Sequence, residues 1–248
     1  MVRCLRPFWL GALVVVIAAA GCGGAKIRFH YPSESLVYPR LGAAPPTLYV
    51  DFINDLRPES QRTGAGRFTT IRFPADENWE LPVNQIYYQA VVQDLTQTDL
   101  VEVVPLRSQA DYFLEVDLEH LGCRVSRRGG ALALLAAGGG ALTYALTQSV
   151  GAAVAGAVIA AGAVPVPTEM RAVCQVKLRV FDQDQELFFE RTCLGEVSKE
   201  VWEGATARKD QEWVDAYLAV AVKRCNACLL GQLRQALLEA GEDLETLQ

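Results

Sequence analysis

The feature that most constrains the fold is a pair of alternating segments, 170–181 and 186–198, separated by the polar run Asp182-Gln183-Asp184-Gln185. Alternation places the apolar side chains of a strand on one face. A short polar run between two such strands is typical of a β-hairpin. The two segments therefore predict a hairpin within a sheet that has one buried face.

Closing this hairpin between Gln183 and Asp184 predicts which residues face each other. The resulting pairs combine opposite charges or similar side chains: Lys177–Glu190, Val180–Leu187, Leu178–Phe189 and Cys174–Cys193. Side chains directly opposite have Cβ atoms ~4.5–5.5 Å apart, which is close to the spacing that a disulfide requires. A Cys174–Cys193 bridge is one prediction, and two buried thiols are the alternative.

Other periodic segments predict four further strands and two helices. The strands are expected at 47–54, 67–73, 100–104 and 111–126. The last of them needs a bulge near Gly122, because its apolar face changes there. A helix is expected over 82–98, with Asp94 as the polar exception in its apolar stripe, and a long helix over 207–240. This order predicts an α+β fold, with a mainly antiparallel sheet and helices packed on one face.

A long apolar stretch interrupts this pattern. Residues 129–164 contain no charged side chain, and small residues recur at helical spacing at Ala152, Gly156 and Ala160. Small faces let helices approach closely in lipid. The stretch fits a hairpin that enters or touches a membrane, a helical pair buried in the domain or in a subunit interface, or a mobile loop. We expect a Gly/Ala-rich helical hairpin insertion over 129–167 within a domain spanning 47–248.

The start of the chain has the parts of a secretory signal. Arg3 and Arg6 precede an apolar run from Phe8 to Ala20, which is shorter than the ~20 residues of a membrane span. The run Ala19-Ala20-Gly21-Cys22 resembles a bacterial lipobox. This implies that residues 1–21 are removed and that Cys22 carries lipid. The alternative is a plain signal that leaves Cys22 an ordinary thiol.

Residues 22–46 have little periodicity and predict a tether, in which His30 and Tyr31 have no special role. Gly23 stands where Asp commonly retains lipoproteins on the inner membrane, so the resemblance implies the periplasmic face of the outer membrane. Acyl chains contribute ~0.8 kcal/mol per buried CH2 to membrane binding. The first expected partner is therefore a membrane, bound through the lipid anchor.

Charge and motif content exclude several classes of function. Loss of Arg3 and Arg6 with the signal changes the formal net charge from −6 to −8. Nucleic acid is therefore not an expected partner, because phosphate binding needs clustered Lys and Arg. No catalytic, cofactor or metal motif is present, so we expect neither an enzyme nor a metal site. His120 is expected to be a surface or edge histidine.

Beyond Cys4 and Cys22 the sequence contains five cysteines: Cys123, Cys174, Cys193, Cys225 and Cys228. An odd number leaves at least one thiol outside disulfides within the chain. Cys225 and Cys228 lie one turn apart in the long helix. Core packing or pairing with a sheet cysteine is expected of them, because they sit in the middle of a helix and lack a second pair at metal spacing.

Three short motifs point to one family. Trp79-Glu80-Leu81-Pro82 precedes the first helix, Gln93-Asp94-Leu95 through Val103-Val104 joins that helix to a strand, and Ala110-Asp111-Tyr112 opens the next strand. Together they resemble motifs of the auxiliary lipoproteins of ABC-type lipid transporters, the group that serves paraquat-inducible and other intermembrane transport systems. The likeness covers about residues 47–127 and 170–240 and rests on structural motifs.

This resemblance implies an outer-membrane lipoprotein that acts as a non-enzymatic auxiliary component of intermembrane lipid transport. Its implied partners are an MCE-type lipid-binding protein and an ABC permease. The opening strand and Ala110-Asp111-Tyr112 also resemble the curli-secretion lipoprotein and TolB amino-terminal folds. Conjugative surface-exclusion lipoproteins carry apolar Gly/Ala stretches as well. The alternative is therefore a ring-forming envelope assembly or secretion lipoprotein, which would be a homo-oligomer.

Overall fold

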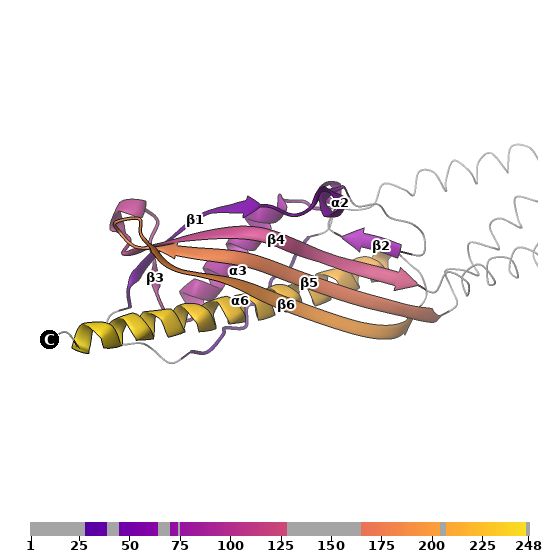
Figure 1. Ribbon diagram of the computed structural model, residues 1–248. Coiled ribbons are helices and arrows are strands. Elements are labelled where there is room, and N and C mark those ends of the chain that lie inside the picture. The colour runs from indigo at the N-terminus through magenta and orange to yellow at the C-terminus, as the bar shows by residue number, and fades with distance from the viewer. Residues whose placement is uncertain are drawn as a thin grey trace, which may run out of the picture.

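The computed structural model describes residues 28–38, 45–63, 70–73, 75–127, 165–203 and 207–246 (Figure 1). The elements in chain order are β1 (Thr47–Asp55), α2 (Glu59–Arg62), β2 (Thr70–Phe73), η1 (Asp76–Asn78), α3 (Val83–Gln97), β3 (Glu102–Val103), η2 (Arg107–Gln109), β4 (Tyr112–Arg127), β5 (Val166–Phe181), β6 (Leu187–Glu203) and α6 (Ala207–Thr246). The predicted helices and hairpin strands are confirmed, and the hairpin strands and the last helix are longer than expected.

The strands form one mixed sheet. Its order is β3-β1-β4-β5-β6, and β2 pairs with the far part of β4. β1 is parallel to both β3 and β4, whereas β4, β5 and β6 are antiparallel neighbours. Parallel neighbours need a crossover connection, and α3 supplies it between β1 and β3. The predicted α+β class is confirmed, and the crossover explains why the sheet is mixed.

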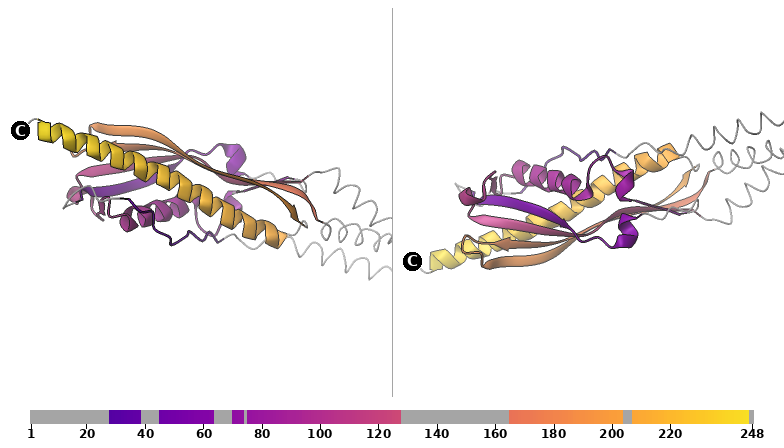
Figure 2. Two further views of the ribbon diagram at one scale, coloured as in Figure 1. Left: turned by 90° about the horizontal axis from the view of Figure 1, so that it is seen from below. Right: turned by 90° about the horizontal axis from the view of Figure 1, so that it is seen from above.

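Both long helices cover one face of the twisted sheet (Figure 2). α6 runs across β6, β5 and β4, and α3 packs against β1 and α6. The buried core lies between these layers, because one side chain in two along β4 and β5 points toward the helices. The fully buried members on these strands include Leu114, Val116, Leu118, Val176, Leu178 and Val180.

Two details of register differ from the predictions. The bulge of β4 lies between Leu118 and His120, rather than near Gly122. In the hairpin, Val180 faces Phe189 rather than Leu187. The amide of Gln185 donates to the carbonyl of Asp182 over 3.1 Å, and Gln185 has a φ of 64°. The turn therefore centres one residue later than expected, which moves the partner of every β5 residue up to Val180 by two residues and leaves the faces unchanged.

The register change separates the two hairpin cysteines. Cys174 faces Gly195, and Cys193 faces Val176. The pairing on which a Cys174–Cys193 bridge was predicted is therefore wrong, and the two cysteines are not joined to each other in the structure. Lys177 faces Thr192 in the ladder, but its ammonium still reaches the carboxylate of Glu190 diagonally over 2.9 Å.

Gly195 determines how closely α6 approaches the sheet. A Cβ at this position would overlap the carbonyl oxygen of Ala221 and lie 2.6 Å from the amide nitrogen of Cys225. The backbone of α6 therefore lies directly against β6 here, and only glycine leaves room for it. This contact brings the two cysteines of α6 over the two cysteines of the hairpin.

Candidate functional site

The segment 28–38 lies against α3 and α6 and does not behave as a free linker. His30 contacts Asp215 twice, through its backbone amide and through Nδ1, each over 2.8 Å. The hydroxyl of Tyr38 donates to the carbonyl of Ala227 over 2.7 Å. These contacts lay the segment along α6, in the same direction as the helix. The expectation that His30 and Tyr31 have no special role is therefore corrected.

Tyr31 enters a buried polar network between the two helices. Asp94 of α3 is fully buried and accepts hydrogen bonds from Tyr31, Lys223 and Asn226. The amide oxygen of Asn226 in turn accepts a hydrogen bond of 2.9 Å from the hydroxyl of Tyr87. Burial and the hydrogen bond to Asp94 raise the pKa of Tyr31, so Tyr31 remains a donor. The network explains why a polar residue, Asp94, occupies a position in the otherwise apolar stripe of α3.

These contacts fix where the start of the chain joins the domain. The guanidinium of Arg28 pairs with Glu80, just before α3, over 2.8 Å, and His30 lies beside the first part of α6. Fully extended, the chain from Cys22 to Arg28 reaches at most ~22 Å. A lipid on Cys22 would therefore lie near this part of the domain.

The same region contains the points where the insertion joins the sheet. β4 ends at Arg127, β5 begins at Val166, β6 ends at Glu203 and α6 begins at Ala207, all at one end of the molecule (Figure 1). We call this the insertion end. Segment 28–38 approaches it from the side of α6 (Figure 2).

Aromatic side chains occur on both faces of the insertion end. Trp202 of β6 is 70% exposed. On α6, the rings of Trp213 and Tyr217 stack with centroids 5.2 Å apart, and the ammonium of Lys199 lies 5.8 Å from the ring centre of Trp213. Trp and Tyr are enriched where proteins meet the membrane–water interface. This composition would suit contact with lipid headgroups.

The motif residues Trp79 and Pro82 lie beside a recess of about 440 Å3 at the start of α3. Trp79 is buried, and its ring packs edge-on against Phe29 with centroids 6.3 Å apart. Pro82 stands at the N-cap, where a missing amide hydrogen costs nothing. The motif thus anchors the start of α3 and helps to hold segment 28–38.

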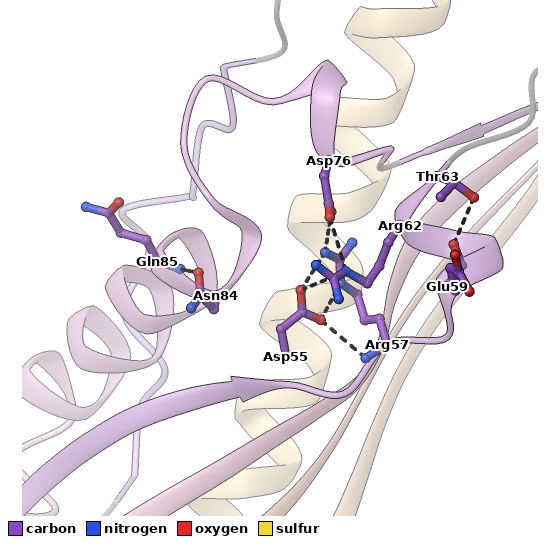
Figure 3. Close-up of polar contacts among 8 residues, drawn as sticks. All are labelled: Asp55, Arg57, Glu59, Arg62, Thr63, Asp76, Asn84 and Gln85. Atoms are coloured by element: carbon purple, nitrogen blue, oxygen red, sulfur yellow. Dashed lines mark hydrogen bonds and ion pairs between the residues drawn. The ribbon is translucent and has the colours of Figure 1, made fainter.

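Two aspartates and two arginines form the polar wall of the recess (Figure 3). The buried guanidinium of Arg57 contacts Asp55 over 2.8 Å and Asp76 over 2.7 Å, and Arg62 contacts Asp76 over 3.1 Å. Burial alone would raise the pKa of Asp55, but the hydrogen bonds and charge of Arg57 lower it below its usual value. The formal charges of this cluster balance, so it can bind β1, α2 and η1 together but presents no excess charge to a ligand.

The motif residues Asp111 and Tyr112 connect the starts of two strands. The carboxylate of Asp111 accepts hydrogen bonds from the amide and the hydroxyl of Thr47, over 2.9 and 2.7 Å. These bonds lower the pKa of Asp111. The ring of Tyr112 packs on Phe188 with centroids 4.9 Å apart. Both residues therefore have structural contacts.

Four cysteines gather between the hairpin and α6. Cys174, Cys193 and Cys225 are fully buried, and Cys228 is half-buried. Burial and a hydrogen bond with the thiol of Cys225 raise the pKa of Cys174, and burial and a hydrogen bond with the thiol of Cys228 raise the pKa of Cys193. The structure thus brings each predicted disulfide residue to a helix cysteine.

Other predicted residues have less distinctive surroundings or lie outside the described residues. His120 is partly buried, and its Nδ1 lies 2.6 Å from the amide nitrogen of Gln61. No group of side chains in the described part of the chain could hold a metal ion, and no helix described there is both long and apolar enough to span a bilayer. Cys22, Ala152, Gly156 and Ala160 lie outside the described residues.

Sequence reasoning did not identify the network around Asp94 or the aromatic residues of the insertion end. Lys223 and Asn226 lie more than a hundred residues after Asp94, in α6, and Tyr31 lies 63 residues before it, so no local pattern reveals these partners. One signal was available: Lys223 and Asn226 are polar residues adjoining the apolar stripe of the long helix. Trp202, close to the end of its strand, gave no comparable signal.

No family model and no curated protein matches the sequence. Among solved structures, a Xanthomonas campestris protein of family DUF330 is 12% identical, with a TM-score of 0.42, covering 88% of this chain and 95% of that one. A Helicobacter pylori homologue of the neuraminyllactose-binding hemagglutinin is 9% identical, with a TM-score of 0.38, covering 90% of this chain and 100% of that one. Sequence identities and TM-scores as low as these do not assign an activity to this protein.

Proposed function

We propose that this protein is a lipoprotein of the outer membrane, facing the periplasm, that serves as a non-enzymatic auxiliary component of an ABC-type intermembrane lipid transport system. Cys22 anchors it in the membrane, and the α+β domain docks an MCE-type lipid-binding protein that works with an ABC permease. The apolar insertion 129–167 touches or enters the membrane.

The observation that carries this proposal is where two segments leave the domain: the segment that leads back to Cys22 and the insertion 129–167. The segment that leads back to Cys22 leaves the domain near the start of α6, where His30 binds Asp215. The insertion leaves from Arg127 and returns at Val166, at the insertion end. Both would therefore reach one bilayer without a change in the domain, and the opposite end would remain available to a partner.

The motif residues support the family likeness through their contacts. Trp79 and Pro82 fix the start of α3, and Asp111 ties β4 to β1. These are positions on which the fold depends, so they are consistent with a docking module. The two aspartates and two arginines beside Trp79 pair with one another, which is consistent with a structural role for this cluster.

The test is purification of the tagged full-length protein from cross-linked native envelopes. We expect an acylated Cys22 by mass spectrometry, together with an MCE-type protein and an ABC permease. A Cys22→Ser variant is the matched control and should lose both the lipid and the co-purified transporter. A closed ring of this protein without transporter subunits would overturn the proposal and favour the envelope-assembly alternative.

A further inference from the structure

We infer that the four cysteines between the hairpin and α6 form two disulfides, Cys174–Cys225 and Cys193–Cys228, that fasten the helix to the sheet. The inference rests on the proposed envelope location, because disulfides form and persist in the oxidising periplasm. Each bridge would join one cysteine of the hairpin to one cysteine of α6.

The backbone geometry brings these pairs together. Cys174 and Gly195 face each other across β5 and β6, and the backbone of α6 at Cys225 lies directly on Gly195. No side chain therefore stands between α6 and the ladder at this point. The thiol of Cys225 also lies 3.5 Å from the carbonyl oxygen of Cys193. Helix and hairpin cysteines thus share one buried layer.

The backbone arrangement selects the pairing. Cys174 faces Gly195, on which the backbone of Cys225 lies. β6 ends and α6 begins at the insertion end, so the two run in opposite directions (Figure 1), and a step from this contact toward the hairpin turn reaches Cys193 on β6 and Cys228 on α6. Cys225 and Cys228 are successive thiols on one helical turn, and Cys174 and Cys193 come from neighbouring strands. Each helix cysteine therefore has its own sheet partner, and the two bridges do not compete for a thiol.

The chemistry needs one equivalent of a disulfide donor for each bridge. The thiolate of half-buried Cys228 attacks the donor, forms a mixed disulfide and releases one donor thiol. The thiolate of Cys193 then attacks the Cys228 sulfur, which closes the bridge and releases the second donor thiol. Each cysteine loses one proton and one electron, and the donor gains both electrons. Cys174 and Cys225 react in the same way before α6 covers them, because burial leaves their thiols inaccessible.

Tryptic cleavage gives this pairing a distinctive product. Cys174 lies in the peptide 172–177, Cys193 in 192–199, and both helix cysteines in 225–234. The full-length protein is alkylated at low pH as isolated from envelopes, and also after protein that was reduced and unfolded in urea has refolded in the presence of oxidised glutathione. We expect the three peptides joined as one species. The Cys123→Ser variant, which leaves all four residues intact, should give the same species.

Paired variants then define the connectivity. Cys174→Ser/Cys225→Ser should leave peptide 192–199 joined to 225–234, and Cys193→Ser/Cys228→Ser should leave 172–177 joined to 225–234. A Cys225–Cys228 bridge within one peptide, or four alkylated thiols after glutathione treatment, would overturn the inference. Bridges that form with glutathione but are absent in protein isolated from envelopes would instead contradict the envelope location.

Discussion

The side chain with the greatest structural consequence is Asp94. It is fully buried, and its main charged partner, Lys223, has a side chain only 15% exposed. Removing one partner of a buried ion pair leaves the other charge without compensation, which costs far more than the loss of an exposed pair. Because Asp94 also binds Tyr31, the same carboxylate holds segment 28–38 in place.

We therefore expect Asp94→Asn to lower the free energy of unfolding by about 3 kcal/mol. The matched control is Asp215→Asn, which removes the carboxylate that binds the exposed His30 ring and should cost less than about 1 kcal/mol. Urea unfolding of the purified domain measures both. Equal effects of the two substitutions would contradict the role assigned to the buried network.

Asp55 gives a prediction about pH. Its pKa in the folded protein is lowered by Arg57, so its contribution to stability is complete above its ordinary pKa and is lost as pH falls through the lower folded value. Asp55→Asn should reduce the free energy of unfolding by about 1–2 kcal/mol near neutral pH. That difference should shrink toward about pH 2 in urea titrations. A difference that does not change with pH would contradict the ion-pair assignment.

At the scale of elements, the periodicity of apolar residues predicted the helices and strands, which local sequence determines. It did not predict the register of the hairpin. The apolar stripe of 82–98 and the alternation of 170–181 suffice to define α3 and β5. The turn centre depended on Gln185 adopting a positive φ, which is uncommon for a residue other than glycine. Opposite charges at Lys177 and Glu190 favoured the wrong register, since they pair diagonally instead.

The same limit applies to the candidate site. The run that resembles a lipobox and the apolar stretch 129–164 were visible in sequence, but nothing local showed that segment 28–38 packs along α6. The cysteines could be counted, but their partners could not be assigned, because the pairing depends on how α6 crosses β5 and β6. Gly195 controls that crossing, and its importance appears only when the two backbones are in contact.

Gly195→Ala tests this close approach. The added Cβ would collide with backbone atoms of Ala221 and Cys225, which cannot move without shifting α6. We expect a loss of about 3 kcal/mol, at the upper end of typical single substitutions. The control is Gly231→Ala within α6, where the nearest atom is the Tyr38 hydroxyl at 3.9 Å and alanine should stabilise the helix by up to about 1 kcal/mol. Thermal unfolding under reducing conditions compares them, and a Gly195→Ala protein as stable as wild type would refute the packing argument.

At the scale of the whole molecule, the arrangement predicts an orientation. α6 has 40 residues and is therefore ~60 Å long, much longer than the ~22 Å that separates Arg28 from Cys22 at full extension. With the proposed lipid anchor on the side of the insertion end, the hairpin turn at Asp182–Glu186 should point away from the bilayer. Trp202 would then lie in the headgroup region.

Fluorescence quenching tests this orientation. We expect the fluorescence of the lipidated mature protein to fall in vesicles of brominated phosphatidylcholine relative to unbrominated vesicles, and Trp202→Phe to remove most of that fall. Trp79 is buried and should not contribute, whereas Trp213, which is partly covered by stacking on Tyr217, should account for the smaller fall that remains. In the Trp202→Phe background, Leu187→Trp places an indole at the opposite end, where the native side chain is 53% exposed, and should restore fluorescence without restoring quenching. Stronger quenching at position 187 than at 202 would reverse the orientation, because bromine quenches an indole only at short range and therefore only close to the bilayer.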